Sequence, residues 1–325
     1  MNPQTRLLWF RRLALAGAVL AAAVVVLGAW VRLTDAGLGC PDWPGCYGHT
    51  YPQAGHDVGK AWHEMVHRYF AGTLVLVITT LMAWTVVFRK DSAQPRAPAA
   101  LLFVIVLFQA ALGALTVTRL LKPLIVTGHL LGGLTTLGIL CWLALTPEER
   151  LPTARERRLL LFALLAFGVL VLQIALGGWT SANYAAVACP DFPTCQQSWW
   201  PRMDFRDAFV LWRGLDVDYT GGVLANPARV AIHLTHRLGA ATAGSVLLLV
   251  GLTVAFTGAS SRLRLAGALV AGAVLLQICI GISMVHFGMP LPLAAMHNAG
   301  AALLVICVVA LLRMLVPLPH VDRSR

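Results

Sequence analysis

The sequence predicts an all-α membrane protein in which eight transmembrane helices form two pseudo-symmetric four-helix bundles. The composition, the number of apolar segments and an internal repeat support this prediction. Of the 325 residues, 58% are hydrophobic and 12% are charged, and the mean hydropathy is +0.74. A soluble domain exposes far more polar and charged surface than this composition supplies. The composition therefore indicates an integral membrane protein.

Eight apolar segments are each long enough to cross a bilayer as a helix, which takes about 20 residues. They cover residues 12–33, 63–88, 99–119, 124–146, 158–179, 230–257, 265–287 and 291–316. An even number of spans puts both termini on one side, and fifteen of the 25 Lys and Arg residues fall on that side. Because basic loops stay in the cytoplasm, we expect cytoplasmic termini and two long outward loops. This topology accounts for the net charge of +11 without a nucleic-acid partner.

The second half of the chain repeats the first. Segment 28–46 recurs at 177–195 without a gap, and each copy contains a Gly-x-Trp motif and two cysteines. Later matches fall at a larger offset because the second outer loop is 20 residues longer, an excess that the repeat does not explain and that would suit a docking surface. Each copy has four spans, so both have the same orientation, related by an axis along the membrane normal. We expect one bundle in residues 1–150 and the other in 151–325.

Four histidines occupy equivalent places in the repeat, near the outer ends of helices that enter the membrane from outside. They are His67, His129, His236 and His297. Two imidazoles on facing helices leave a flat slot between them, as a bis-histidine heme requires. The alternative is that each histidine only makes hydrogen bonds between helices. Zinc is a weaker interpretation, because the histidines come one per helix and three of them lack a nearby carboxylate.

Glu64 breaks the symmetry of the repeat, since the second half has His233 in its place. It precedes His67 by about one helical turn, so both side chains lie on one face of the helix. A carboxylate in such a site can relay protons or stabilise a cationic intermediate. Alternatively, it pairs with Arg68 or Lys60. The asymmetry suggests that the first half reacts and the second assists.

Other polar residues allow two interpretations each. Arg68 and Arg237 directly follow histidines and either bind heme propionates or extend to the outer interface. Gln109 and Gln277 are expected to join helices by hydrogen bonds, because the same Gln-x-x-x-Gly pattern occurs at Gln173 with no histidine role in view.

Each outward loop contains two cysteines, at Cys40 and Cys46 and at Cys189 and Cys195. In an oxidising compartment, a disulfide within each pair is the default. The alternative for the first pair, which lies near Glu64, is a thiol relay. The spacing is not that of a covalent c-type heme site.

The motifs together resemble those of the heme A synthase family, over about residues 20–315. They are Gly28-x-Trp30-x-Arg32-Leu33-Thr34 running into the first cysteine loop, Glu64-x-x-His67-Arg68, His129, His233-x-x-His236-Arg237-Leu238-Gly239 and Met296-His297-Asn298. The two cysteine pairs resemble the bacterial type of the family.

The resemblance implies a membrane oxidoreductase that converts heme O to heme A for cytochrome oxidase assembly. One porphyrin methyl group becomes a formyl group through a hydroxymethyl intermediate, heme I. By the same resemblance, His236 and His297 are the axial ligands of a heme b cofactor, whereas His67 and His129 flank the heme O substrate. Glu64 is essential for the reaction.

The implied surroundings are a bacterial inner (cytoplasmic) membrane, with the heme sites toward its outer side. The implied partners are heme O, heme O synthase as its donor and an unidentified electron donor, and small residues in the sixth span are compatible with a homo-oligomer. Two rival functions share some of these features. A bis-histidine cytochrome b that only carries electrons leaves the one-sided placement of Glu64 unexplained, and a heme transporter or chaperone would release an unaltered porphyrin.

Overall fold

Eight long helices lie side by side in the computed structural model, which describes residues 1–53, 57–91, 94–146, 153–214 and 217–316. All eight are long and apolar enough to cross a membrane, which confirms the predicted fold class. They are α1 (Pro3–Leu33), α2 (Val58–Val87), α3 (Arg96–Thr118), α4 (Pro123–Ala144), α5 (Ala154–Ala182), α7 (Asn226–Thr257), α8 (Ser261–His286) and α9 (Leu291–Leu315). A short helix, α6 (Phe205–Ala208), lies in the loop after α5.

The first helix begins nine residues before the predicted span. Asn2 caps it, because its side-chain oxygen accepts the backbone N–H of Thr5 at 2.8 Å, and Pro3 occupies the first turn. An N-terminal proline loses no helical hydrogen bond and has its φ angle already set for the helix. The apolar pattern therefore defined the part of α1 suited to the bilayer but not its polar first turns.

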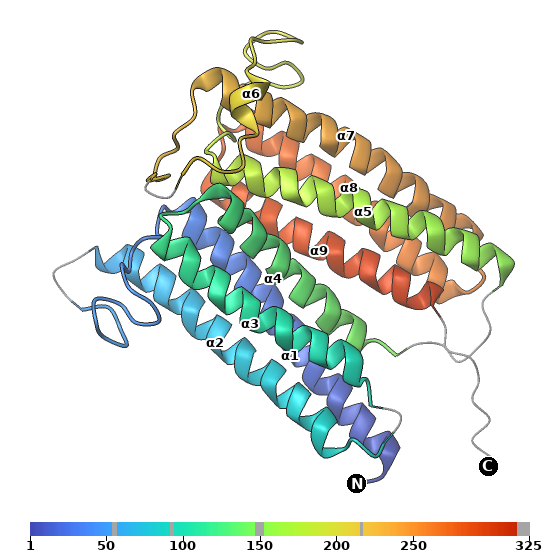
Figure 1. The fold of residues 1–325 in the computed structure, drawn as a ribbon. Helices are drawn as coiled ribbons and strands as arrows, with labels where there is room; N and C mark the ends of the chain where they lie inside the picture. Colours follow the sequence, from blue (N-terminus) through green and yellow to red (C-terminus); the bar gives the residue numbers. More distant parts are fainter. Residues whose placement is uncertain (54–56, 92–93, 147–152, 215–216, 317–325) are drawn as a thin grey trace.

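The helices form two groups (Figure 1): α1 to α4, and α5 with α7, α8 and α9. The groups meet where α4 packs against both α5 and α9, and where α1 packs against α9. In the repeat α1 corresponds to α5 and α4 to α9, so the contact of α1 with α9 has its counterpart in that of α4 with α5. This arrangement is consistent with two bundles related by a pseudo-two-fold axis. The boundary expected at residue 150 lies outside the described residues.

Equivalent residues of the two halves touch each other at the end of the molecule that carries the long loops. Arg32 donates from Nη2 to the carbonyl oxygen of Ser181 at 2.8 Å, and the hydroxyl of Tyr184 donates to Oδ1 of Asp35 at 3.1 Å. Both pairs are separated by 149 residues, which is the offset of the repeat. A residue meets its own equivalent only near a two-fold axis, so these contacts are consistent with an axis that passes between the loop-bearing ends of α1 and α5.

The main apolar core lies toward the end of the bundles opposite the long loops. It includes Phe10, Ile78, Leu102, Leu137, Leu263 and Leu311, each at most 1% exposed, and it runs through both bundles. The polar side chains of the repeat lie at the other end, nearer the loops. The continuous core fixes the two bundles against each other and thus sets the positions of the four histidines.

Candidate functional site

The four repeat histidines lie near the loop-bearing ends of α2, α4, α7 and α9, as predicted. In the second bundle, the ring centroids of His236 and His297 are 6.5 Å apart, with an angle of 75° between the ring planes. Two imidazoles joined through one metal ion have centroids roughly 6 Å apart, because each metal–nitrogen bond is about 2 Å long. The spacing of this pair therefore fits axial ligation of one iron.

Each of the four imidazoles lies against a glycine of a neighbouring helix. A Cβ atom added to that glycine would come within 2.9–3.4 Å of the ring Cε1 atom; the glycines are Gly28, Gly113, Gly177 and Gly281. Only glycine lets the ring approach the neighbouring backbone this closely.

Three of these rings also have a buried nitrogen without a described partner. Nδ1 of His67, of His129 and of His297 makes no hydrogen bond of good geometry among the described residues, although the rings of His67 and His129 lie close to the backbone of Val24 and of Gln109. Half-buried imidazoles with unpartnered nitrogens, held between apolar helices, suit metal coordination. The residues present therefore fit the heme groups that the resemblance implies.

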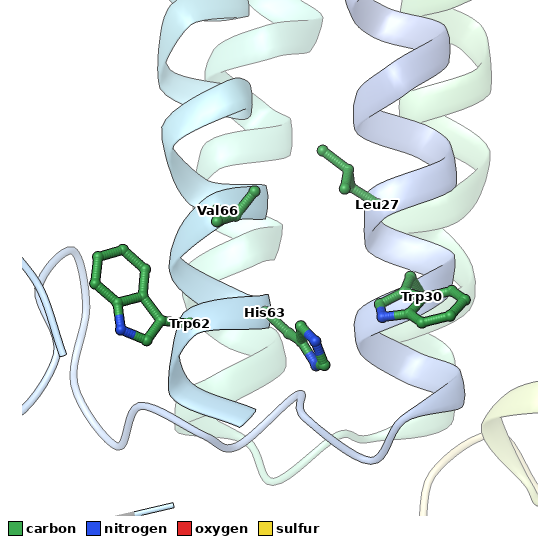
Figure 2. A pocket seen from close by; sticks show the side chains of 5 residues that line it. All are labelled: Leu27, Trp30, Trp62, His63 and Val66. Atoms are coloured by element: carbon green, nitrogen blue, oxygen red, sulfur yellow. The ribbon is translucent and has the colours of Figure 1, made fainter. Parts of the chain in front are cut away.

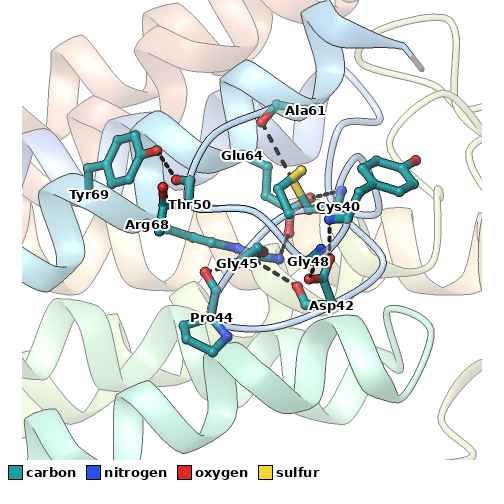
Figure 3. The surroundings of a disulfide bond; sticks show 12 residues. Cys40, Asp42, Pro44, Gly45, Gly48, Thr50, Ala61, Glu64, Arg68 and Tyr69 are labelled. Atoms are coloured by element: carbon teal, nitrogen blue, oxygen red, sulfur yellow. Dashed lines mark hydrogen bonds and ion pairs between the residues drawn. A yellow bond between two sulfur atoms is a disulfide. The ribbon is translucent and has the colours of Figure 1, made fainter. Parts of the chain in front are cut away.

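Glu64 is only 4% exposed and lies under the first cysteine loop (Figure 3). Its Oε1 is 2.5 Å from Nη2 of Arg68, and its Oε2 accepts the backbone N–H of Cys40 at 2.9 Å. The pairing with Arg68 is thus present. The carboxylate oxygens of Glu64 thus contact Arg68 and the cysteine loop. The spacing in the sequence predicted only that Glu64 and His67 lie on one face of the helix.

Arg68 and Arg237 hold the two cysteine loops by hydrogen bonds to backbone carbonyl groups. Arg68 donates from Nη1 to the oxygens of Asp42 and Gly45, at 2.8 and 2.5 Å. Arg237 donates to the oxygens of Thr194 and Cys189, at 2.8 and 2.9 Å, and from Nε to Nε2 of His233 at 3.2 Å.

These contacts bear on the predicted roles of the arginines and cysteines. The guanidinium groups of Arg68 and Arg237 already donate hydrogen bonds to loop carbonyl groups, so a heme propionate bound by either arginine would accept from the same group. The loops themselves are closed by disulfides between Cys40 and Cys46 and between Cys189 and Cys195, which confirms the default pairing.

The two bundles differ at their loop-bearing ends. In the first, an apolar cavity of about 250 Å³ between α1 and α2 is lined by Leu27, Trp30, Trp62, His63 and Val66. His63 and Trp30 face each other across it (Figure 2), with ring centroids 6.3 Å apart.

In the second bundle the equivalent place is covered. Trp179 and Ile232, the counterparts of Trp30 and His63, are 7% and 0% exposed. The indole N–H of Trp179 donates to the carbonyl oxygen of Ala208 in α6 at 2.9 Å. At least part of the 20-residue excess in the second loop therefore covers its own bundle, which accounts for an insertion that the repeat left unexplained.

A buried lysine fastens the same loop to the first bundle. Lys122, at the start of α4, is 0% exposed; its Nζ donates to the carbonyl oxygen of Gly214 and lies 3.4 Å from the ring centroid of Trp212. The indole ring of Trp212 thus packs on this cation.

Replacing Lys122 with Met removes both contacts. Because a hydrogen bond from a charged group contributes about 1.5–3 kcal/mol, we expect the loop to detach and trypsin to cleave faster after Arg213. The control is K60M, which removes an exposed lysine of α2. Equal cleavage rates in the two variants would contradict this role of Lys122.

One predicted role is wrong. Gln173 was expected to have no histidine role, but its Nε2 lies 3.0 Å from Nδ1 of His236, and Gly177 faces the same ring. The sequence did contain a signal: the Gln-x-x-x-Gly pattern occurs in three of the four helices whose glycines face a histidine.

The fold and site define a class of protein: a multi-pass helical membrane protein with one histidine pair near the loop-bearing end of each of two repeated bundles. The family model for COX15-CtaA, described as cytochrome oxidase assembly protein, matches residues 11–309. The chain belongs to this family.

Similar proteins carry one common description. The heme A synthase of Shewanella oneidensis is 41% identical over 265 residues, which cover 75% of this chain and 78% of that protein. The heme A synthase of Exiguobacterium sibiricum is 30% identical over 191 residues, covering 56% and 61%. A further heme A synthase, from an Exiguobacterium species, is 28% identical over 236 residues, covering 70% and 76%.

Proposed function

We propose that this chain is a heme A synthase. It oxidises one methyl group of heme O to a formyl group, through the hydroxymethyl intermediate heme I, and so supplies heme A for cytochrome oxidase assembly. The observation that carries this proposal is the pairing of two equivalent histidine sites with a buried acid in only one of them. Membership in the cytochrome oxidase assembly family supports the same reaction.

The first bundle is the substrate half and the second is the cofactor half. A substrate must enter and leave, whereas a cofactor stays. The open cavity between α1 and α2 suits exchange, and the cover of α6 over the equivalent place suits retention. His67 and His129 then flank heme O, and His236 and His297 hold heme b.

The protein residues orient the substrate and handle protons. Heme b, when bound, supplies a one-electron centre next to the substrate. The conversion of a methyl group to a formyl group breaks C–H bonds and adds one oxygen atom, from O2 or from water, so protons are exchanged during the reaction, and Glu64 is the buried acid of the substrate half that can exchange them. Arg68 stabilises the charge of that carboxylate, and the Cys40 N–H holds its other oxygen. Arg68 and Arg237 are also placed to bind heme propionates at the outer end, if their guanidinium groups donate to the propionates as well as to the loop carbonyl groups.

The eight spans and the family place the protein in a bacterial membrane. We assign it to the inner membrane with cytoplasmic termini and outward heme sites, because the basic residues lie mostly on the side of the termini. Heme O synthase is then the donor of its substrate, and a separate electron donor or acceptor completes the reaction. Contacts of small residues between copies would allow a homo-oligomer.

The test is to purify the protein from a host that makes heme O and to identify the extracted hemes by chromatography and mass. We expect heme b together with heme A or heme I. Heme b with no altered porphyrin would identify an electron-carrying cytochrome instead, and unaltered heme O alone would indicate a carrier of heme. Absence of any heme would contradict all four histidine assignments.

A further inference from the structure

Glutamine side chains fasten the histidine-bearing helices to their neighbours. In the first bundle, Nε2 of Gln109 on α3 donates to the backbone carbonyl oxygen of His129 on α4 at 2.7 Å. In the second bundle, Nε2 of Gln277 on α8 donates to the carbonyl oxygen of His297 on α9 at 2.9 Å. Each bond ties the backbone at the histidine itself to the next helix, and thereby fixes the depth of the imidazole.

Gln173 on α5 makes the same contact with His236 on α7, at 3.0 Å, and adds a second. The same Nε2 lies 3.0 Å from Nδ1 of the ring; because an amide nitrogen can only donate, this contact requires an unprotonated Nδ1. A neutral histidine that binds a metal through Nε2 has its proton on Nδ1, so the contact of Gln173 that is compatible with a bound metal is the one to the backbone carbonyl of His236.

Each glutamine needs a glycine three residues after its histidine. A methyl group built on Gly132, Gly239 or Gly300 would overlap Oε1 of Gln109, Gln173 or Gln277, respectively. We call a glutamine and the glycine beneath it a glutamine–glycine pair. The glutamine supplies the hydrogen bond and the glycine supplies the space, so neither is sufficient alone.

The fourth histidine has neither member of the pair. Val24 of α1 stands where the repeat places Gln173, and Phe70 of α2 stands three residues after His67, where the repeat places Gly239. Phe70 is 41% exposed. A valine cannot donate to the backbone of α2, and Phe70 lacks the space that a glutamine would need. His67 is also the histidine whose helix carries Glu64.

We propose that the three glutamine–glycine pairs fix His129, His236 and His297, and that their absence beside His67 makes it the labile iron ligand of the substrate heme. This inference rests on the proposed function. The cofactor iron has two fixed ligands and stays bound. The substrate is an iron porphyrin with an isoprenoid chain. Its iron has one fixed ligand, His129, and one labile ligand, His67, which lies on α2 beside the cavity between α1 and α2.

The test is to exchange the two arrangements. V24Q/F70G places a glutamine–glycine pair beside His67, V24L/F70G provides the same space without the amide, and Q173V removes the amide beside His236. Each purified protein, loaded with heme O and heme b, is mixed with excess apomyoglobin, and the loss of each heme is followed by extraction and by the low-spin absorbance of the protein. Because one hydrogen bond contributes about 1 kcal/mol, we expect about fivefold slower release of heme O from V24Q/F70G than from V24L/F70G.

Heme b serves as the internal control for folding. It should leave V24Q/F70G and V24L/F70G at the wild-type rate and leave Q173V about fivefold faster, with part of the iron becoming high-spin. Equal heme O release from the two first-half variants, or unchanged heme b release from Q173V, would overturn the inference. If V24Q/F70G does not retain heme b, its fold is disturbed, and the rate of heme b release from Q173V then tests the inference. The proposed function is tested separately: if it is wrong, the wild-type protein yields no altered porphyrin, whatever the release rates of the variants.

Discussion

Replacing Glu64 with Gln lowers heme A formation at least about 100-fold, the effect expected from the loss of a general acid–base group. The amide has the same size, and its oxygen can still accept the Cys40 N–H. It cannot accept a proton from the substrate or form the ion pair with Arg68. The measurement is the ratio of heme A and heme I to heme O in the purified protein, together with its heme b content, which we expect to be unchanged.

The repeat provides a matched control for this variant. His233 occupies the place of Glu64 in the second half and contacts Arg237 as Glu64 contacts Arg68. H233Q therefore perturbs an equivalent contact under an equivalent disulfide loop. We expect H233Q to keep most of the synthase activity, and equal losses in H233Q and E64Q would show that the contact matters only for folding.

A second control separates chemistry from support of the loop. In C40A/C46A the first loop loses its disulfide, whereas Glu64 and Arg68 remain. If Glu64 served only to anchor this loop, C40A/C46A would lose as much activity as E64Q. We expect a smaller loss, since the carboxylate stays in place. The same variant tests the thiol relay, because a redox-active pair would make its loss as severe as that of Glu64.

The features of the site that follow from helical periodicity could be predicted from the sequence. The position of a residue along an apolar helix fixes the depth of its side chain in the membrane. The common depth of His67 and His129, and that of their repeat equivalents, could therefore be predicted from the sequence. The repeat also predicted the equivalence of α1 with α5 and of α4 with α9. The contact between Arg32 and Ser181, two equivalent residues, agrees with that prediction.

The contacts that depend on which helices are neighbours could not be predicted in the same way. The glycine at 239 has a role only because α5 packs on α7 and brings Gln173 above it. The direction of the Glu64 carboxylate depends on the fold of the cysteine loop, whose backbone N–H at Cys40 it accepts. Likewise, the cover that α6 places over Trp179 arises in an insertion that has no counterpart in the first half.

Alanine substitutions of the four histidines should fall into two classes, one for each bundle. H236A and H297A remove a ligand of the cofactor, so heme b content falls at least about tenfold, given that about 1.4 kcal/mol of lost binding energy suffices for that factor. H67A and H129A leave the second bundle intact, so heme b content stays at the wild-type level, while less heme O is bound and no heme A is formed. The measurement is the heme b and heme O content per protein after extraction.

The two classes distinguish the proposed division of labour from a symmetric alternative. If both bundles held permanent hemes, as in an electron-carrying cytochrome, all four variants would lose heme b to a similar extent. The ring spacing of 6.5 Å between His236 and His297 and the cover over Trp179 favour retention in the second bundle. In the first, the open cavity and the lone acid favour turnover. Loss of heme b from H67A but not from H297A would reverse the assignment of cofactor and substrate.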